Sequence, residues 1–178
     1  MTSSPDDPAC SVAHGTAPAG VPDEADQRVL VAVFASPVAD FLLRYGRDAG
    51  YRTVLVEPDL DRARGAAEAG TMVEPAVVAY PAGSADVVVT DHHRAELGVM
   101  LRDALDSKAR WVGIMGNPRV PAPHIPALAA LGVAEDQIGQ VHRPVGLNIG
   151  SRAPAEIAIA TIAGLIASRN GRPGGFAF

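Results

Sequence analysis

The chain has 178 residues, a formal net charge of −5 and a single cysteine, Cys10. This length suffices for one domain with its own core, since domains commonly hold about 100–200 residues. The acidic balance argues against nucleic acid as a partner, no apolar run reaches the ~20 residues of a membrane span, and one cysteine excludes an internal disulfide. We therefore expect one globular cytoplasmic domain that contacts neither nucleic acid nor a membrane.

The two ends of the chain differ in composition from its middle. Residues 1–27 are rich in Pro, Asp, Ala, Gly and Ser and hold few large apolar side chains. Such a segment buries too little apolar surface to offset the entropy of ordering it. We predict a flexible tail over 1–27, one domain over 28–171 and a C-terminal tail over 172–178.

The domain begins with a predicted strand, helix and strand. The run RVLVAVF from Arg28 is continuously apolar and rich in β-branched residues, which is typical of a parallel strand buried on both faces. Apolar residues then recur at helical spacing from Val38 to Ala49, and Gly50 follows where a left-handed cap is expected. The second strand is RTVLVEP, which ends at Pro58.

Strands and helices continue to alternate along the chain. Residues 69–84 predict at most a short edge strand and a loop, ADVVVTD is a clear strand, 94–106 is a helix and RWVGIMG is a strand. Two short helices follow, the first capped by Gly132, and Pro154 opens a last helix that is apolar on nearly every side. This order predicts an α/β fold with a doubly wound, mostly parallel, Rossmann-like sheet. The last helix is expected inside a layer or at a subunit interface.

Polar residues at the ends of two strands are candidates for a site, because ligands of doubly wound sheets bind beyond the carboxyl ends of the strands. Glu57 ends the second strand about 20 residues after the first turn, the place of a ribose-binding acid, with a solvent-facing acid as the alternative. Asp91, His92 and His93 follow a later strand and could provide a base with an orienting acid. Side chains of adjacent residues in an extended segment point to opposite sides, so we predict no metal site there.

The segment GIMGN places Gly113, Gly116 and Asn117 at the end of another predicted strand. Glycines at such a position let the backbone approach a bound group. A tight turn without a ligand would use the same glycines. Both interpretations of this segment remain open from the sequence.

The segment VGLNIGSRAP before the last helix is a candidate anion site. Gly146 and Gly150 permit unusual backbone angles, and Arg152 stands just before the helix opened by Pro154. Free amides, the helix dipole and the guanidinium would converge on an anion such as phosphate. Ala153 provides no side-chain cap, so this helix start favours either an exogenous anion or water.

Three motifs carry a resemblance to one family. HRPVGLNIGSRAPAEIA resembles H-x-P-I-G-L-D-I-G-x-R-T-P-E-E-I-A of the XdhC/CoxI family, RWVGIMGN resembles its Y-V-G-L-I-G-S, and VVVTDHH resembles its V-V-V-x-T-H-x-H. The resemblance implies a C-terminal Rossmann domain of a factor that matures molybdenum hydroxylases such as xanthine and carbon monoxide dehydrogenases. Family members, as it implies, bind the molybdenum cofactor, protect it during sulfuration and pass it to the apoenzyme. They usually carry a further N-terminal domain, so this chain resembles a stand-alone module.

The resemblance extends to individual positions. His93 matches the second histidine of the T-H-x-H stretch and Glu96 lies near its later acid, but Asp91 takes the place of the first histidine. Asn148 replaces an aspartate and Asn117 a serine. The residues that agree with the family pattern are Gly113, Gly116, His142, Pro144, Gly146, Leu147, Gly150, Arg152, Pro154 and Glu156.

The first turn departs most from the family, which there has roughly F-G-A-G-H-V-A. Phe34 and Ser36 stand at the two glycines, of which the first permits the tight turn and the second lets the backbone contact pyrophosphate. Two β-carbons close much of that space, which argues against a fully seated dinucleotide. Ser36 could still donate one hydrogen bond, and Pro37 could open the helix.

Three functions follow as hypotheses. The first is an accessory protein of molybdenum hydroxylase maturation that binds the molybdenum cofactor or a related nucleotide, with the apoenzyme or another maturation subunit as partner. The second is an NAD(P)-dependent oxidoreductase, and the third is a non-catalytic interaction module, with a homodimer packed through the last helix. No nucleophile or convincing acid–base pair is visible, so we lean against catalysis, with Asp91 and His93 as its only candidates. The candidate cofactor-binding residues are Ser36, Glu57, Gly113, Gly116, Asn117, Gly146, Asn148, Gly150 and Arg152.

Overall fold

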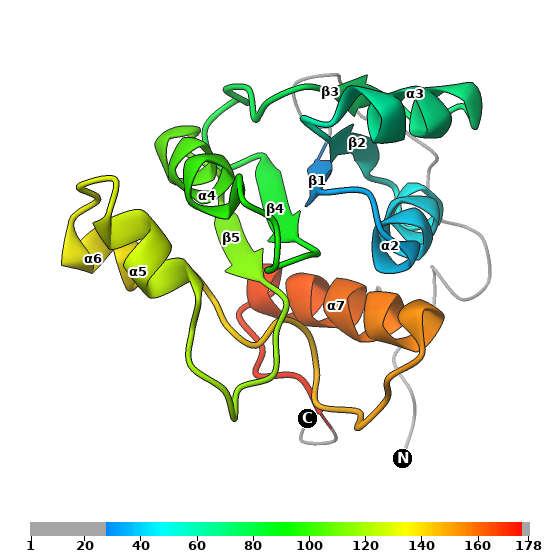
Figure 1. The fold of residues 1–178 in the computed structure, drawn as a ribbon. Helices are drawn as coiled ribbons and strands as arrows, with labels where there is room; N and C mark the ends of the chain where they lie inside the picture. The colour runs from blue at the N-terminus through cyan, green and yellow to red at the C-terminus, as the bar shows by residue number, and fades with distance from the viewer. Residues whose placement is uncertain (1–27, 176–178) are drawn as a thin grey trace, which may run out of the picture.

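A five-stranded parallel sheet forms the centre of the molecule (Figure 1). The computed structural model describes residues 28–175, so the predicted tail over 1–27 lies outside the described residues, as do 176–178. The order of the strands is β3-β2-β1-β4-β5, and all neighbouring strands pair in parallel. The strands are β1 (Val29–Val33), β2 (Arg52–Val56), β3 (Val73–Glu74), β4 (Ala85–Val89) and β5 (Trp111–Ile114).

Helices cover both faces of the sheet, as the sequence predicts for a doubly wound fold. The helices are α2 (Pro37–Asp48), α3 (Leu60–Glu68), α4 (Leu97–Asp106), α5 (His124–Ala129), α6 (Glu135–Ile138) and α7 (Pro154–Arg169). Leu30 and Ala32 of β1 pack with α2 and α7, whereas Val31 and Val33 pack with α4, α5 and α6 on the opposite face. Burial on both faces is the reason why the strands are continuous apolar runs. The predicted single-domain, Rossmann-like α/β fold is confirmed.

Helix α3 is absent from the sequence-based prediction. None of its residues is buried, so it has no apolar stripe from which a helical period can be recognised. A side-chain cap marks its start instead. The Asp59 carboxylate accepts hydrogen bonds from the amides of Asp61 and Arg62, each at 3.0 Å.

Helix α4 begins three residues later than the predicted range of 94–106. Arg94 therefore lies in the loop after β4, and its side chain turns toward the end of β2 instead of lining a helix. The predicted left-handed positions Gly50 and Gly132 are confirmed, with φ of 81° and 75°.

Helix α7 packs on α2 and the sheet with one side only. Ala158, Ile162 and Leu165 are buried there, whereas Ile159 on the other side is 55% exposed. The expected interface through this helix stays a prediction. Of the helices within 28–175, none has both the length and the apolar character needed to span a membrane.

The strand order reverses between β1 and β4, which marks the place where Rossmann-like folds hold their ligands. The turn 34–36 and the segment 90–93 lie at this point. His142 pairs in parallel with Gly113 of β5, so the loop 143–153 leaves from the same edge of the sheet before α7 begins.

Candidate functional site

The turn between β1 and α2 has an unusual backbone at Phe34. This residue is fully buried and has a φ of 73°, a left-handed conformation that costs a residue with a side chain about 1–2 kcal/mol. The position therefore retains the backbone conformation that favours the glycine of the family pattern. The Phe34 ring belongs to the core cluster on the α4 face of the sheet.

The Ser36 side chain hydrogen-bonds to residues at the end of β4 and in α2, at the point where the strand order reverses. Its hydroxyl donates to Thr90 Oγ1 at 2.9 Å and accepts from the Ala39 amide at 3.1 Å, which caps α2. Thr90 in turn donates to the carbonyl oxygen of Phe34 at 2.8 Å. The hydroxyl that was predicted to contact a cofactor is thus engaged within the protein, and its cofactor-binding role stays a prediction.

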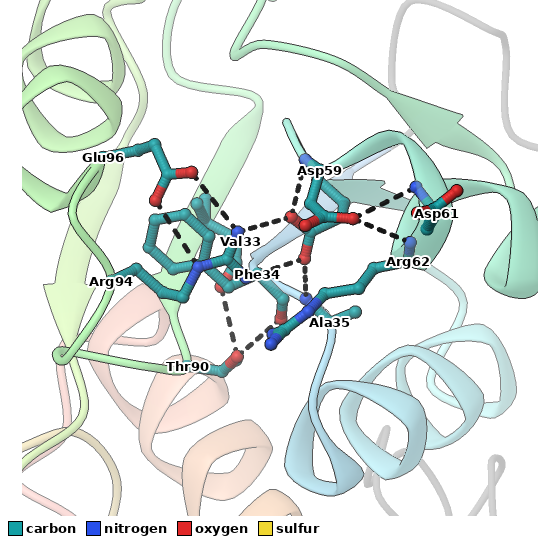
Figure 2. A network of polar contacts seen from close by, with 10 residues as sticks. Val33, Phe34, Ala35, Asp59, Asp61, Arg62, Thr90, Arg94 and Glu96 are labelled. Carbon is teal, nitrogen blue, oxygen red and sulfur yellow. Dashed lines mark hydrogen bonds and ion pairs between the residues drawn. The ribbon is translucent and has the colours of Figure 1, made fainter.

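Glu57 lies at the centre of a polar network beside this turn. Figure 2 shows this network with Ala35, Asp59 and Arg94 labelled. Glu57 is 1% exposed, so the alternative of a solvent-facing acid is wrong. Its carboxylate accepts from the amides of Ala35 at 2.8 Å and Asp59 at 3.0 Å, and from the guanidinium of Arg94 at 3.0 and 3.3 Å. A ribose could reach these oxygens only by replacing bonds that the chain already makes, so ribose binding stays a prediction.

Arg94 is a residue of this network that the sequence did not single out. Its side chain is 12% exposed, its guanidinium lies 4.7 Å from the centre of the Phe34 ring, and Glu96 forms a second ion pair with it at 3.4 Å. Two buried or half-buried carboxylates and an aromatic face thus surround one cation. The arrangement locks the loop after β4 onto the end of β2.

A cavity of about 470 Å³ lies on the outer side of the β1–α2 turn, between α2 and α3. Ser36, Asp40 and Arg62 are its polar lining residues. Asp40 and Arg62 carry opposite charges, so the lining does not select strongly for an anion.

Asp91, His92 and His93 form a turn and not the extended segment that we expected. The Asp91 carboxylate accepts from the His93 amide at 2.9 Å, and the two imidazole rings lie 4.1 Å apart. The prediction that the two rings point to opposite sides is therefore wrong. Burial, followed by the charge of His93, lowers the pKa of His92 below its usual value. Among residues 28–175, no group of three or more His, Cys, Asp or Glu could hold a metal ion.

A cavity of about 440 Å³, here called the loop cavity, lies between the loop after β5 and the loop before α7. It brings together five of the predicted cofactor-binding residues, and it adds Arg119, which the sequence did not single out. Within residues 28–175, neither Arg119 nor Arg152 forms an ion pair. The predicted residues that line the loop cavity are Asn117, Gly146, Asn148, Gly150 and Arg152.

Glycine has different roles at the two left-handed positions of this loop. At Gly146, with φ of 83°, a β-carbon would lie 2.8 Å from the backbone nitrogen of Thr161, so glycine lets the loop lie directly on α7. At Gly150, with φ of 71°, a β-carbon would meet nothing within 4 Å. The first glycine is required by close packing and the second by backbone conformation alone.

Arg143 connects the two walls of the loop cavity. Its guanidinium donates to the carbonyl oxygens of Asn117 at 2.6 Å and Val120 at 3.2 Å. A β-carbon at Gly116 would lie 3.0 Å from Arg143 Nε, so this glycine leaves room for the arginine. Gly116 thus acts through packing beside the cavity, and its cofactor-binding role stays a prediction.

Gly113 also has a packing role. A β-carbon there would lie 2.2 Å from the ring of Trp111, which stacks on His142 with centroids 4.9 Å apart. Gly113 is not among the residues that line the loop cavity. Gly113 lies within β5 and not in a turn, so the tight-turn interpretation is wrong for this glycine, and its contact with a ligand stays a prediction.

The start of α7 lacks a side-chain cap, as predicted. Ser151 accepts a hydrogen bond at 3.0 Å from the amide of Ala153, the cap residue itself. The Ser151 hydroxyl also hydrogen-bonds to the carboxylate of Glu156 in the first turn. Ser151 therefore orders the loop before α7 without capping the first-turn amides, and anion binding there stays a prediction.

A further buried network lies at the opposite, amino-terminal edge of the sheet. The Asp86 carboxylate accepts from Arg110 at 2.7 Å, and Tyr51, which also contacts Asp86, accepts from Arg169 of α7 at 2.6 Å. Burial raises the pKa of Asp86 above its usual value, and the charge of Arg110 opposes this shift. This network ties α7 to the sheet far from the ligand edge.

Comparisons with known proteins place the chain in a family. The chain is 38% identical over 78 residues to the uncharacterised protein YqeB of Escherichia coli (strain K12), a match that covers 42% of this chain and 14% of that protein. A solved structure of a xanthine dehydrogenase from Bacillus halodurans superposes with a TM-score of 0.64 at 20% identity, over 82% of this chain and 45% of that one. At this identity the second match shows the fold alone, and this chain spans less than half the length of either relative. The family model described as the XdhC Rossmann domain matches residues 30–165, and the chain therefore belongs to the XdhC family as its Rossmann domain.

Proposed function

We propose that this chain acts in the maturation of molybdenum hydroxylases and holds the molybdenum cofactor, or a related nucleotide, in the loop cavity. The observation that carries the proposal is the convergence of Arg119 and Arg152 on one cavity with the side chains of Asn117 and Asn148. No Asp or Glu is among the lining residues. A cavity lined by two arginines and by no carboxylate suits the phosphate of such a ligand.

Different residues of the loop cavity would contact different parts of the ligand. Arg119 and Arg152 would bind the phosphate, and the exposed Asn117 and Asn148 would donate or accept hydrogen bonds at the polar edges of the pterin. Val145, Ile149 and Ile157 provide an apolar wall for a planar ring. The bound cofactor would supply the metal centre for the hydroxylase, and this chain would hold and release it.

Arg143 would act as a positioning residue for the same site. Its bonds to the carbonyl oxygens of Asn117 and Val120 hold the loop that carries Arg119, while its own backbone leads into the other wall at Pro144. Both walls are thereby fixed before a ligand binds, which lowers the entropic cost of binding.

The partners belong to the same proposal. The cofactor would be handed to a molybdenum hydroxylase apoenzyme or to another maturation subunit in the cytoplasm. A homodimer packed through α7 belongs to the same proposal, since this helix is apolar along most of its length, and size-exclusion chromatography with light scattering tests it. Independent catalysis is not part of the proposal.

Calorimetric titration of the purified chain with a molybdopterin-type ligand, NAD and NADP tests the function. We expect binding of the pterin ligand and at least about tenfold weaker binding in Arg152→Ala and Arg119→Ala, because each loses a charge-assisted bond to phosphate. Arg47→Ala, which removes an exposed arginine from the far end of α2, is the matched control and should bind as the wild type does. Tight NAD binding without pterin binding would overturn the proposal and favour the oxidoreductase.

A further inference from the structure

We infer that the Glu57 carboxylate permanently occupies the anion position of the β1–α2 turn, so that this Rossmann domain binds no dinucleotide there. In a dinucleotide-binding fold the amides of this turn and the start of the following helix face the pyrophosphate. Here the amide of Ala35 donates to Glu57 Oε2 at 2.8 Å instead. A side chain of the protein thus takes the bond that a phosphate oxygen would take.

Three further polar groups of the turn make hydrogen bonds within the protein. The Phe34 amide donates to the carbonyl oxygen of Val56 at 2.8 Å, and the Ala39 amide donates to Ser36 Oγ. The hydroxyl of Ser36 in turn donates to Thr90. A phosphate that took up any of these groups, or the Ala35 amide, would have to break the bond that the group already makes.

The charge of Glu57 also opposes a phosphate at this amide. The Glu57 side chain is fully buried, and its charge is balanced by Arg94, whose guanidinium is in contact with the Phe34 ring. A phosphate that took up the Ala35 amide would lie beside this carboxylate, and like charges at close range repel. Displacing Glu57 would leave a buried carboxylate without its partners, which is more costly than leaving the site unchanged.

The inference reaches beyond the proposed function, because it concerns a different site. It assigns Glu57 and Arg94 a role as a built-in substitute for a bound anion. It holds whether or not the loop cavity binds a pterin.

Chemical rescue of Glu57→Ala tests the inference. Removing the carboxylate leaves Arg94 and the Ala35 amide around a space of carboxylate size, so the variant should be destabilised and should bind a small carboxylate from solution. We expect about 0.1 M acetate or formate to raise the Tm of the variant by about 2–4 °C relative to sodium chloride at equal ionic strength, with no such rise in the wild type. An equal effect of acetate on both proteins would overturn the inference.

A second measurement keeps the test independent of the variant's ability to fold. Titration of the wild-type protein with ADP and with NAD, followed through backbone amide resonances, should leave the Ala35 amide unshifted up to millimolar ligand. A saturable shift of the Ala35 and Ser36 amides with either ligand would show that the turn accepts a nucleotide and that the inference is wrong.

Discussion

The hydroxyl groups of Ser36 and Thr90 lie 2.9 Å apart and join the ends of β1 and β4 at the point where the strand order reverses. In doubly wound sheets this point is the crevice that receives the ligand. Here the bond between the two hydroxyls, together with the bond from Thr90 to the carbonyl of Phe34, joins the two sides of the crevice. The proposed ligand site is instead the loop cavity, which Arg119 and Arg152 line without forming an ion pair within residues 28–175.

Replacing Arg94 by methionine should lower the free energy of unfolding by about 3 kcal/mol, because it leaves the buried Glu57 carboxylate without its cation. Replacing both residues, as Arg94→Met with Glu57→Leu, should recover much of this loss, since the uncompensated charge is removed as well. Urea denaturation of the two single variants and the double variant measures the interaction free energy between Glu57 and Arg94.

The matched control for this pair is Arg64→Met, because Arg64 and Asp61 form an ion pair on the surface, with side chains 68% and 91% exposed. Little change is expected in that variant. A double variant that is less stable than the sum of the two single effects predicts would contradict the account of the Glu57–Arg94 pair.

Gly146→Ala and Gly150→Ala should differ in their effect on stability, although both glycines are left-handed. At Gly146 a methyl group would press on the backbone of α7, so we expect a loss of about 2–4 kcal/mol in the free energy of unfolding. At Gly150 only the backbone conformation is unfavourable, which predicts a loss of about 1 kcal/mol. Thermal and urea unfolding of the two variants compare them directly, and equal losses would show that the contact of Gly146 with α7 is unimportant.

Gly113→Ala should displace the ring of Trp111 from its stack on His142, because the new methyl group would overlap the ring. Trp111 is the one tryptophan of the chain, so its fluorescence reports on this position. We expect a shifted emission maximum and a loss of about 1–3 kcal/mol in the free energy of unfolding. If the emission spectrum and the stability both match those of the wild type, the packing role of Gly113 is excluded.

Stability should fall as the pH drops through the histidine range. Burial, followed by the charge of Arg143, lowers the pKa of His124, which is 5% exposed, below its usual value. A group whose pKa is lower in the folded state binds more protons when unfolded, so stability declines once the pH falls below the unfolded value of about 6.5. His124→Leu should reduce the difference in unfolding free energy between about pH 7.5 and about pH 5.5. A larger difference in the His124 variant would contradict the sign of the shift.

Strands β1, β2, β4 and β5 could be predicted from the sequence because each is a mainly apolar run bounded by turn residues, whereas the two-residue β3 has no such run. The segment of β4, for example, is buried along its whole length, and its boundaries are visible as Ser84 and Thr90. The loop cavity could be predicted in part, because Gly146, Gly150 and Arg152 stand in one short motif. Arg119 could not, since nothing in its local sequence indicates that its loop folds back toward that motif.

The sequence indicates a narrowed turn at Phe34 and Ser36, but the contacts of Glu57 with this turn could not be derived from it. Glu57 stands where a ribose-binding acid is expected, and its pairing with Arg94 across 37 residues depends on the fold. The turn at Asp91 was available as a signal, because an aspartate side chain often accepts from the amide two residues later. Helix α3 was missed since a helix without a buried face leaves no period in the sequence.

The central claim is that a ligand binds in the loop cavity and leaves the β1–α2 turn unoccupied. Mapping of backbone amide shifts during titration with a molybdopterin-type ligand tests it most directly. We expect saturable shifts at Asn117 and across 146–152, and no shift at Ala35. In Arg152→Ala the shifts at Asn117 and across 146–152 should be lost. Shifts centred on Ala35 and Ser36, with 146–152 unchanged, would contradict it.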